Sequence, residues 1–260
     1  MKSFCALTIS FLLPLLAQLP APNELGVGMG HLHLKTQNLE GNKKFWVDTL
    51  GGTLGKMGGL EVFKFPGVIV IVQKGAAEGG SEGSSINHLG FKVKNLDSYI
   101  EKFKAGGFAL PRVDMEARQV FVMTPDNVKV EISEDTKMSA PIAHHHIHFY
   151  TESFEETRTW YMKMFGGVPG KRGKFEKTDI PGSELTFTQA DTKMAPTKGR
   201  FMDHIGFEVK GLEEFTKRME GMGVKFDVSY RKVPSLGIAI AFFTDPWGTY
   251  VELTEGLAQF

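Results

Sequence analysis

The order of apolar and polar residues along the chain predicts one set of elements four times over. Each set opens on an alternating segment such as residues 146–150, whose period of two is typical of a β-strand. An amphipathic segment follows, for example Ser153 to Phe165, which we expect to form a helix. Ser153 is placed to cap this helix, with Glu156 completing a capping box and Gly166 ending it.

Three short apolar segments complete each set, and turn residues separate them. In the first set they span 53–58, 60–65 and 68–73, with Pro66 and Gly67 at the last turn. Each set therefore reads as a βαβββ module of about 55 residues. Four such modules predict an α+β protein.

An internal duplication runs through the whole pattern. The segment that begins at His31 aligns without a gap with the one that begins at His146, at an offset of about 115 residues. The register continues through Gly51 and Gly166, and the ends match as Val130-Glu131-Ile132 and Val251-Glu252-Leu253. We therefore expect two homologous domains, 28–135 and 143–256, each containing two modules.

Charge and cysteine content remove several classes of function. The 260 residues carry 30 basic and 30 acidic side chains, so the positive surface that nucleic acids require is not expected. Cys5 is the single cysteine, which excludes an intramolecular disulfide and a cysteine-rich zinc site. Any metal ion would therefore be bound by histidine and carboxylate groups.

The first 22 residues resemble a secretory signal peptide. Lys2 precedes an apolar run from Phe4 to Leu16, and small residues follow, with Ala17 as the preferred cleavage position. The run is about 13 residues long, shorter than the roughly 20 that span a bilayer, so no stable membrane anchor is expected. The protein is predicted to be exported to the periplasm or the extracellular space.

All eight histidines fall in or just before the opening strand of a module, at positions 31, 33, 88, 144, 145, 146, 148 and 204. Strand periodicity puts His31 and His33 on one face, and likewise His144, His146 and His148. Apolar residues alternate with them, so the sequence leaves open which face meets a cavity.

Two glutamates in apolar strands are the other anomaly, because buried carboxylates are normally paired or bound to metal. Glu131 and Glu252 each stand in a predicted closing strand. Each half of the chain therefore offers two histidines and one glutamate, a ligand set that leaves open coordination positions. The sets are His31, His88 and Glu131, and His146, His204 and Glu252. A lone inward histidine is more often a hydrogen-bonded core residue, but here the whole set is repeated.

These features together resemble the vicinal oxygen chelate superfamily, which includes glyoxalase I, extradiol dioxygenases and the fosfomycin and bleomycin resistance proteins. The resemblance covers nearly all of the chain after residue 22. It rests on the opening histidine followed eight residues later by leucine or phenylalanine, on Asp203-His204-Ile205-Gly206-Phe207, and on the closing turn from Thr244 to Leu253.

The resemblance implies that pairs of βαβββ modules form cupped sheets around a divalent metal, which could be Fe, Mn, Zn, Ni or Co. It places ligands at His146, His204 and Glu252 in the second half, and at His31, His88 and Glu131 in the first. Glyoxalase I would add a second glutamate. Glu184 or Thr186 takes that place in the second half, where Ile69 and Ile71 stand in the first.

The implied function is a metal-dependent lyase, isomerase or dioxygenase that acts on a small oxygen-chelating substrate, mainly in the second half. His148 is a candidate for orienting substrate or relaying protons. An extradiol dioxygenase would carry a tyrosine where Phe242 and Phe243 stand, and glyoxalase I is not expected in an exported protein. The alternative is a non-catalytic module that sequesters a small molecule. A monomer or a homodimer is expected.

Overall fold

The computed structural model describes residues 19–260. Most of the expected signal peptide, residues 1–18, lies outside this range. Among the described residues, no helix has the length and apolar character needed to cross a membrane. The four expected modules account for nearly all of this part of the chain.

The four modules follow one another along the chain, each opening on its longest strand or one of its longest. Module 1 contains β1 (Val27–Thr36), α1 (Leu39–Lys43), the π-helical turn η1 (Lys44–Thr49), β2 (Thr53–Met57), β3 (Leu60–Phe65) and β4 (Val68–Lys74). Module 2 contains β5 (Ile86–Val93), α2 (Leu96–Gly106), β6 (Arg112–Asp114), β7 (Gln119–Met123) and β8 (Lys129–Glu134). Module 3 contains β9 (Ile142–Thr151), α3 (Phe154–Phe165), β10 (Val168–Arg172), β11 (Phe175–Ile180) and β12 (Ser183–Gln189). Module 4 contains β13 (Met202–Val209), α4 (Leu212–Gly221), β14 (Phe226–Val233), β15 (Ile238–Thr244) and β16 (Tyr250–Glu255), followed by the 3₁₀ turn η2 (Leu257–Gln259).

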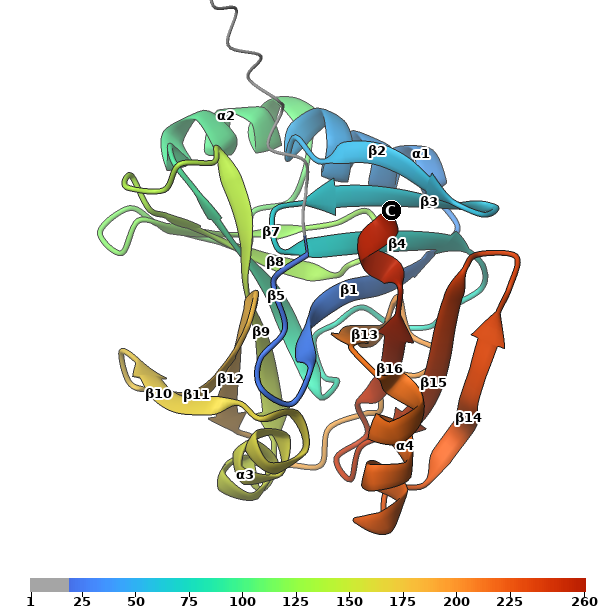
Figure 1. The fold of residues 1–260 in the computed structure, drawn as a ribbon. Coiled ribbons are helices and arrows are strands. Elements are labelled where there is room, and N and C mark those ends of the chain that lie inside the picture. The colour runs from blue at the N-terminus through green and yellow to red at the C-terminus, as the bar shows by residue number, and fades with distance from the viewer. Residues whose placement is uncertain (1–18) are drawn as a thin grey trace, which may run out of the picture.

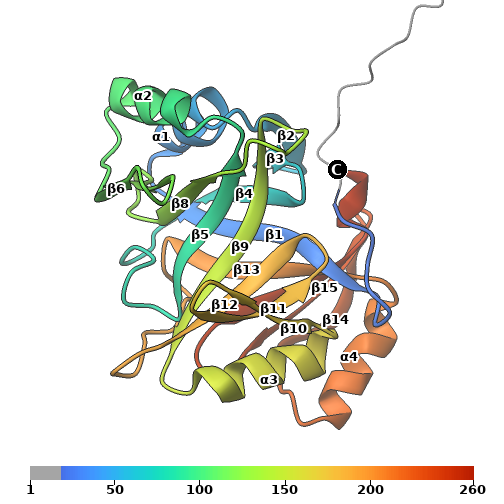
Figure 2. The same cartoon turned by 90° about the vertical axis from the view of Figure 1, so that its left-hand side faces the viewer.

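The modules pair into two eight-stranded mixed sheets, so the predicted α+β fold with paired βαβββ modules is confirmed. One sheet has the order β14-β15-β16-β13-β1-β4-β3-β2, and the other has the order β10-β11-β12-β9-β5-β8-β7-β6. Module 1 therefore pairs with module 4 through β1 and β13, and module 2 pairs with module 3 through β5 and β9 (Figures 1 and 2). The expectation that the two modules of each sequence half share a sheet is wrong.

The helices are nevertheless arranged by sequence half. The α1 and α2 helices lie together at one end of the molecule, and α3 and α4 lie together at the other (Figure 2). Aromatic side chains join the helices of each half, because the ring of Phe45 on η1, directly after α1, stacks on that of Phe103 on α2 at 6.2 Å, and the rings of Phe165 on α3 and Phe215 on α4 stack at 6.3 Å. The helices of each sequence half thus pack together, whereas each sheet contains one module from either half.

The helix predicted from Ser153 onwards is confirmed, but its predicted start differs in detail. Helix α3 begins at Phe154, and the side chain of Ser153 makes no capping hydrogen bond, so the predicted capping box is wrong. The hydroxyl of Thr157 instead donates to the Ser153 carbonyl. Gly166 ends the helix in the left-handed conformation, as its lack of a Cβ allows.

A bulge interrupts the opening strand of modules 1 and 3 at equivalent places. In β1 the pairing with β13 skips Gly30, and in β9 the pairing with β5 skips His145. A bulge residue shifts the alternation of side chains by one position. His144 therefore packs against Phe91 and its Nε2 lies 3.1 Å from the Ser183 Oγ, so the prediction that it shares a face with the later histidines of β9 is wrong.

Candidate metal centre

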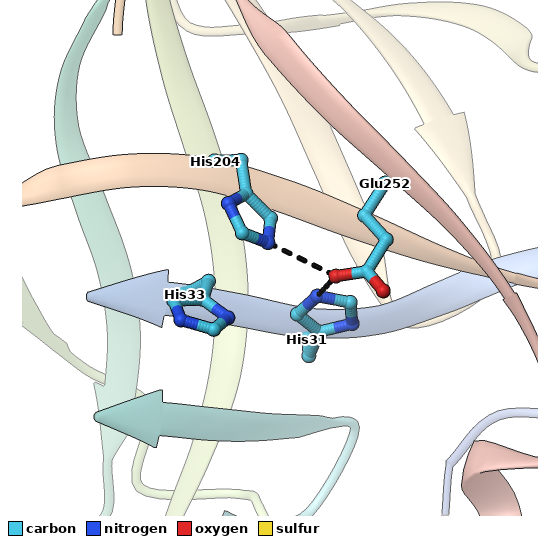
Figure 3. Close-up of side chains that lie close together, drawn as sticks. All are labelled: His31, His33, His204 and Glu252. Carbon is cyan, nitrogen blue, oxygen red and sulfur yellow. Dashed lines mark hydrogen bonds and ion pairs between the residues drawn. The ribbon is translucent and has the colours of Figure 1, made fainter. Parts of the chain in front are cut away.

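Three side chains from three neighbouring strands converge in the sheet formed by modules 1 and 4. The Nε2 atoms of His31 on β1 and His204 on β13 lie 2.9 and 3.0 Å from the same oxygen, Oε2 of Glu252 on β16 (Figure 3). All three residues are buried. With His33 they form a group whose potential ligand atoms lie within 4.8 Å of one another, which we call site A.

A glycine makes room for the His31 ring. Strands β1 and β13 run antiparallel, and Gly206 is the register partner of His31. A Cβ atom at Gly206 would lie 2.0 Å from Cε1 and 2.1 Å from Nδ1 of the ring. Since real Cβ atoms make no contacts below 3.0 Å, the glycine is required for the ring to reach Glu252.

A second carboxylate supports His204 from behind. Oδ1 of Asp203 lies 2.7 Å from Nδ1 of His204, and its other oxygen pairs with Lys35 at 2.8 Å. Burial alone would lower the pKa of His204, but Asp203 and Glu252 raise it above its usual value. Metal-binding histidines commonly donate their second N–H to a carboxylate in this way, which fixes the tautomer and increases ligand basicity.

Glu252 is ionised although it is buried. Burial alone would raise the pKa of its carboxyl, but His31 and His204 hold it well below its usual range. In the described residues no lysine or arginine forms an ion pair with Glu252, and the two histidines are its only partners of this kind. The buried negative charge therefore lacks a permanent cation.

His33 completes site A from the same strand as His31. Its ring stacks on the His204 ring at 4.3 Å, and its Nε2 lies 3.2 Å from Oε1 of Gln73. Burial and the neighbouring His204 lower its pKa to about 3, so the imidazole is neutral in the physiological range. The Tyr250 ring lies edge-on to that of His204, at 5.6 Å.

The sheet of modules 2 and 3 contains the equivalent set, which we call site B: His88, His146, His148 and Glu131. His88 Nε2 lies 3.0 Å from Oε2 of Glu131, and His146 Nε2 lies 3.6 Å from the same oxygen. Gly90 makes room for the His146 ring as Gly206 does for His31, because a Cβ atom at Gly90 would lie 2.0 Å from Cε1 of that ring. His148, the predicted catalytic residue, has its Nε2 2.8 Å from the Thr188 hydroxyl.

The groups that support the histidines differ between the two sites. Where Asp203 contacts His204 in site A, the neutral Asn87 contacts His88 in site B, with 2.9 Å between Oδ1 and Nδ1. Site B also contains a guanidinium: Nη1 of Arg172 lies 3.0 Å from Nδ1 of His146 and 3.5 Å from Oε1 of Glu131.

The position that glyoxalase I would fill with a further glutamate also differs. Glu184 is in register with His146 and Thr186 with His148, so both alternatives lie on the face of site B. The Glu184 carboxylate is nevertheless bound by Lys177 at 2.9 Å. In site A the two equivalent positions are apolar, because Ile69 and Ile71 are in register with His31 and His33.

The grouping of ligands predicted from the sequence is therefore wrong, although the same residue types meet. His31 joins His204 and Glu252, not His88 and Glu131, and His146 joins the latter two. The cause is the pairing of β1 with β13 and of β5 with β9. Sequence reasoning also missed the role of the two glycines, Gly90 and Gly206, whose signal was their repeated place two residues after His88 and His204.

Site A has the donors that a divalent transition metal requires. Two imidazole nitrogens and one carboxylate oxygen are the ligand set of a facial triad, which leaves the remaining positions open. Nε2–H of His31 donates to the Glu252 carboxylate, and the Nδ1 atom is buried without a hydrogen-bond partner among the described residues, so the proton can move to Nδ1 when a metal ion binds Nε2. Together with the ionised Glu252, these residues fit a bound dication.

Paired βαβββ modules with histidines on the opening strands and a glutamate on the closing strand define the class of this protein. The chain belongs to the Glyoxalase/Bleomycin resistance protein/Dioxygenase superfamily, whose family model matches residues 28–132 and 143–253. No curated protein matches the chain.

Solved structures agree with this fold. Glyoxalase I from Zea mays is similar with a TM-score of 0.71 and 16% identity, over 90% of this chain and 94% of that one. A candidate dioxygenase from Bacillus subtilis is similar with a TM-score of 0.69 and 15% identity, over 92% of this chain and 86% of that one. At these identities the similarity establishes the fold.

Proposed function

We propose that the protein is a divalent-metal-dependent enzyme that acts on a small substrate with two adjacent oxygen atoms, and that site A is its centre. The observation that carries this proposal is the convergence of His31 and His204 on one oxygen of Glu252. The three residues come from opposite ends of the chain, and no lysine or arginine among the described residues neutralises the carboxylate.

A divalent ion at this position would act as a Lewis acid that binds both substrate oxygens and stabilises negative charge on them. The protein's own residues prepare the position. Glu252 supplies the anionic ligand, and Asp203 holds Nδ1–H of His204 so that Nε2 faces the centre. Lys35 neutralises the outer oxygen of Asp203 and keeps this support in place.

His33 is placed to contact a substrate rather than to carry charge. Because its imidazole is neutral, it can donate or accept one hydrogen bond, and Gln73 holds the ring from behind. The Tyr250 and Phe242 rings stack on each other at 5.4 Å, and both lie edge-on to the His204 ring. These groups would orient a planar or enolised substrate.

The apolar side of site A offers no further carboxylate ligand. Ile69 and Ile71 belong to a buried cluster that includes Met57, Val62, Leu19 and Leu257. No further carboxylate can reach the centre from β4. Open positions therefore remain for substrate oxygens and water, as dioxygenase and lyase chemistry of this superfamily requires.

Metal content tests the proposal directly. We expect the purified protein to bind one equivalent of a transition metal, and His204→Ala and Glu252→Gln to lose it. His88→Ala and Glu131→Gln are matched controls, since they remove the equivalent residues of site B and should leave that equivalent bound. Equal losses in both pairs, or less than about 0.2 equivalent in the reconstituted wild type, would overturn the proposal.

The same samples decide between catalysis and simple sequestration. A thermal-shift screen of small α-hydroxyketones, catechols and hydroxy acids would be run on metal-loaded and metal-free protein. An enzyme of the proposed kind binds its ligand only when loaded and converts it, as product analysis would show. A ligand that stabilises both forms equally and is recovered unchanged would identify a non-catalytic binding protein.

A further inference from the structure

Sites A and B have the same three types of ligand residue, two histidines and one glutamate. The side chains around them differ: they are charged in site B and apolar in site A, and most of them lie on the flanking strands. In module 3, β10 and β11 form a hairpin in which Arg172 pairs with Phe175. In module 1, β2 and β3 form the same hairpin, and Met57 pairs with Leu60. Met57 is thus the structural equivalent of Arg172, and it lies about 115 residues earlier, as the internal duplication requires.

Arg172 lies beside both the imidazole and the carboxylate groups that would bind a metal ion in site B. Its Nη1 lies 3.0 Å from Nδ1 of His146 and 3.5 Å from Oε1 of Glu131, and its Nε lies 3.7 Å from Oε2 of Glu184. The guanidinium cannot lose its proton, so it is a permanent cation at this place.

This contact also determines which nitrogen of His146 is free. Arginine only donates hydrogen bonds, so Nδ1 of His146 accepts from Arg172, and Nδ1 of His145, which lies 2.9 Å from the same atom, can then contact it only as a second donor. The proton of the neutral imidazole is then on Nε2, the atom that faces Glu131 at 3.6 Å. A metal ligand needs a lone pair on that atom. In site A Nε2–H of His31 donates to Glu252, but Nδ1 has no partner in the described residues, so no cation opposes a move of the proton to Nδ1 when a metal ion binds Nε2.

The charges agree with this difference. In site B, Arg172 pairs with Glu131, and Lys177 pairs with Glu184 and with Asp179, so each carboxylate of the site has a permanent cation beside it. In site A, the residues equivalent to Arg172, Lys177 and Glu184 are Met57, Val62 and Ile69, all apolar and buried. Glu252 there keeps a charge that only the imidazoles offset among the described side chains.

We infer that Arg172 is the built-in cation of site B, that it excludes a metal ion from this site, and that the chain binds one metal ion, in site A. The inference rests on the proposed function for its statement about site A. Its statement about site B depends on the guanidinium alone. Exchange of the arginine for the methionine found at position 57 should therefore create a second metal site.

The test is the metal stoichiometry of Arg172→Met, measured by titration with Zn²⁺ and with Mn²⁺ and by elemental analysis. We expect the wild type to bind one equivalent and Arg172→Met two. His204→Ala should bind none, and the double variant His204→Ala/Arg172→Met should bind one, now in site B. Lys171→Met is the matched control, because it removes an equal charge from the exposed neighbour that pairs with Glu176 and should leave one equivalent.

Each result separates the two claims. A wild type that binds two equivalents, or a folded Arg172→Met that binds the same number as wild type, overturns the inference about Arg172. A wild type that binds no metal overturns the proposed function. In that case, whether Arg172→Met gains one equivalent of metal still tests the inference that Arg172 excludes a metal ion from site B. If Arg172→Met does not fold, Arg172→Gln replaces it, and thermal unfolding shows whether each variant is folded. In the reverse exchange, Met57→Arg should abolish metal binding at site A in a folded protein.

Discussion

Substitution of Gly206 by alanine should remove the metal ion from site A without changing any ligand. A Cβ at this position would lie 2.0 Å from Cε1 and 2.5 Å from Nε2 of His31, whereas ordinary contacts begin at 3.4 Å. The ring must therefore move by roughly 1.4 Å, and it is fully buried between β1 and β13. Metal ligands tolerate displacements of about 0.2 Å, so the change amounts to loss of one of three protein ligands.

We expect the affinity of Gly206→Ala for Zn²⁺ to fall about 100-fold or more, since even substitutions outside the ligands commonly cost 10–100-fold. Overpacking should also lower the free energy of unfolding by about 1–3 kcal/mol. Isothermal titration with the metal and thermal unfolding of the metal-free protein measure the two effects separately.

Gly90→Ala is the matched control, because its Cβ would lie 2.0 Å from Cε1 of His146 in site B. It should cost similar stability and leave metal affinity within about threefold of wild type. The reasoning is refuted if Gly206→Ala keeps its affinity, or if Gly90→Ala loses as much as Gly206→Ala does.

Three further predictions concern the pH dependence, the core and the N-terminus. The pKa of His204 is raised, and a bound metal ion must displace its proton, so metal affinity should increase as the pH rises through that pKa, above 6.5. Asp203→Asn removes a carboxylate that raises this pKa and should shift the increase to lower pH. Metal titrations from pH 5.5 to 8 measure both effects. In the metal-free protein the same group contributes stability that is complete below pH 6.5 and is lost as the pH rises through its folded-state pKa, which urea unfolding across this range would detect. Leu257→Ala should lower the free energy of unfolding by about 2–5 kcal/mol, since the side chain is fully buried over the apolar side of site A, and a loss below about 1 kcal/mol in urea unfolding would contradict this. We propose that the exported protein begins at Gln18, because cleavage after Ala17 keeps Leu19, which is buried in the cluster that contains Ile69, Ile71 and Leu257. N-terminal sequencing that shows loss of Leu19 would contradict this proposal.

The sequence was sufficient to predict the modules and the residue types of the sites. The histidines stand at the same place in each opening strand, and a glutamate inside an apolar strand is costly unless it is paired. These local signals do not depend on how the modules are arranged. The α+β fold of paired modules could therefore be predicted before the structure.

The pairing of modules could not be predicted in this way. Strands β1 and β9 have the same pattern, and so have β5 and β13, so either pairing buries the same kinds of side chain. The sequence of the segments between the modules carries no strong signal for one pairing over the other. The grouping of His31 with His204 follows from this choice.

Two other features escape sequence reasoning for local reasons. The bulge at His145 shifts the alternation within β9, and period-two reasoning has no means of detecting it. Arg172 stands beside a hairpin turn between Lys171 and Lys174, where charged residues are usually solvated. Only the fold shows that its guanidinium reaches His146 and Glu131.

A crystal structure of the protein with Mn²⁺, analysed by anomalous scattering, tests the central claim most directly. We predict one strong peak per chain, about 2.0–2.3 Å from Nε2 of His31, Nε2 of His204 and an oxygen of Glu252. A peak between His88, His146 and Glu131 instead, or no peak at saturating Mn²⁺, would contradict the account.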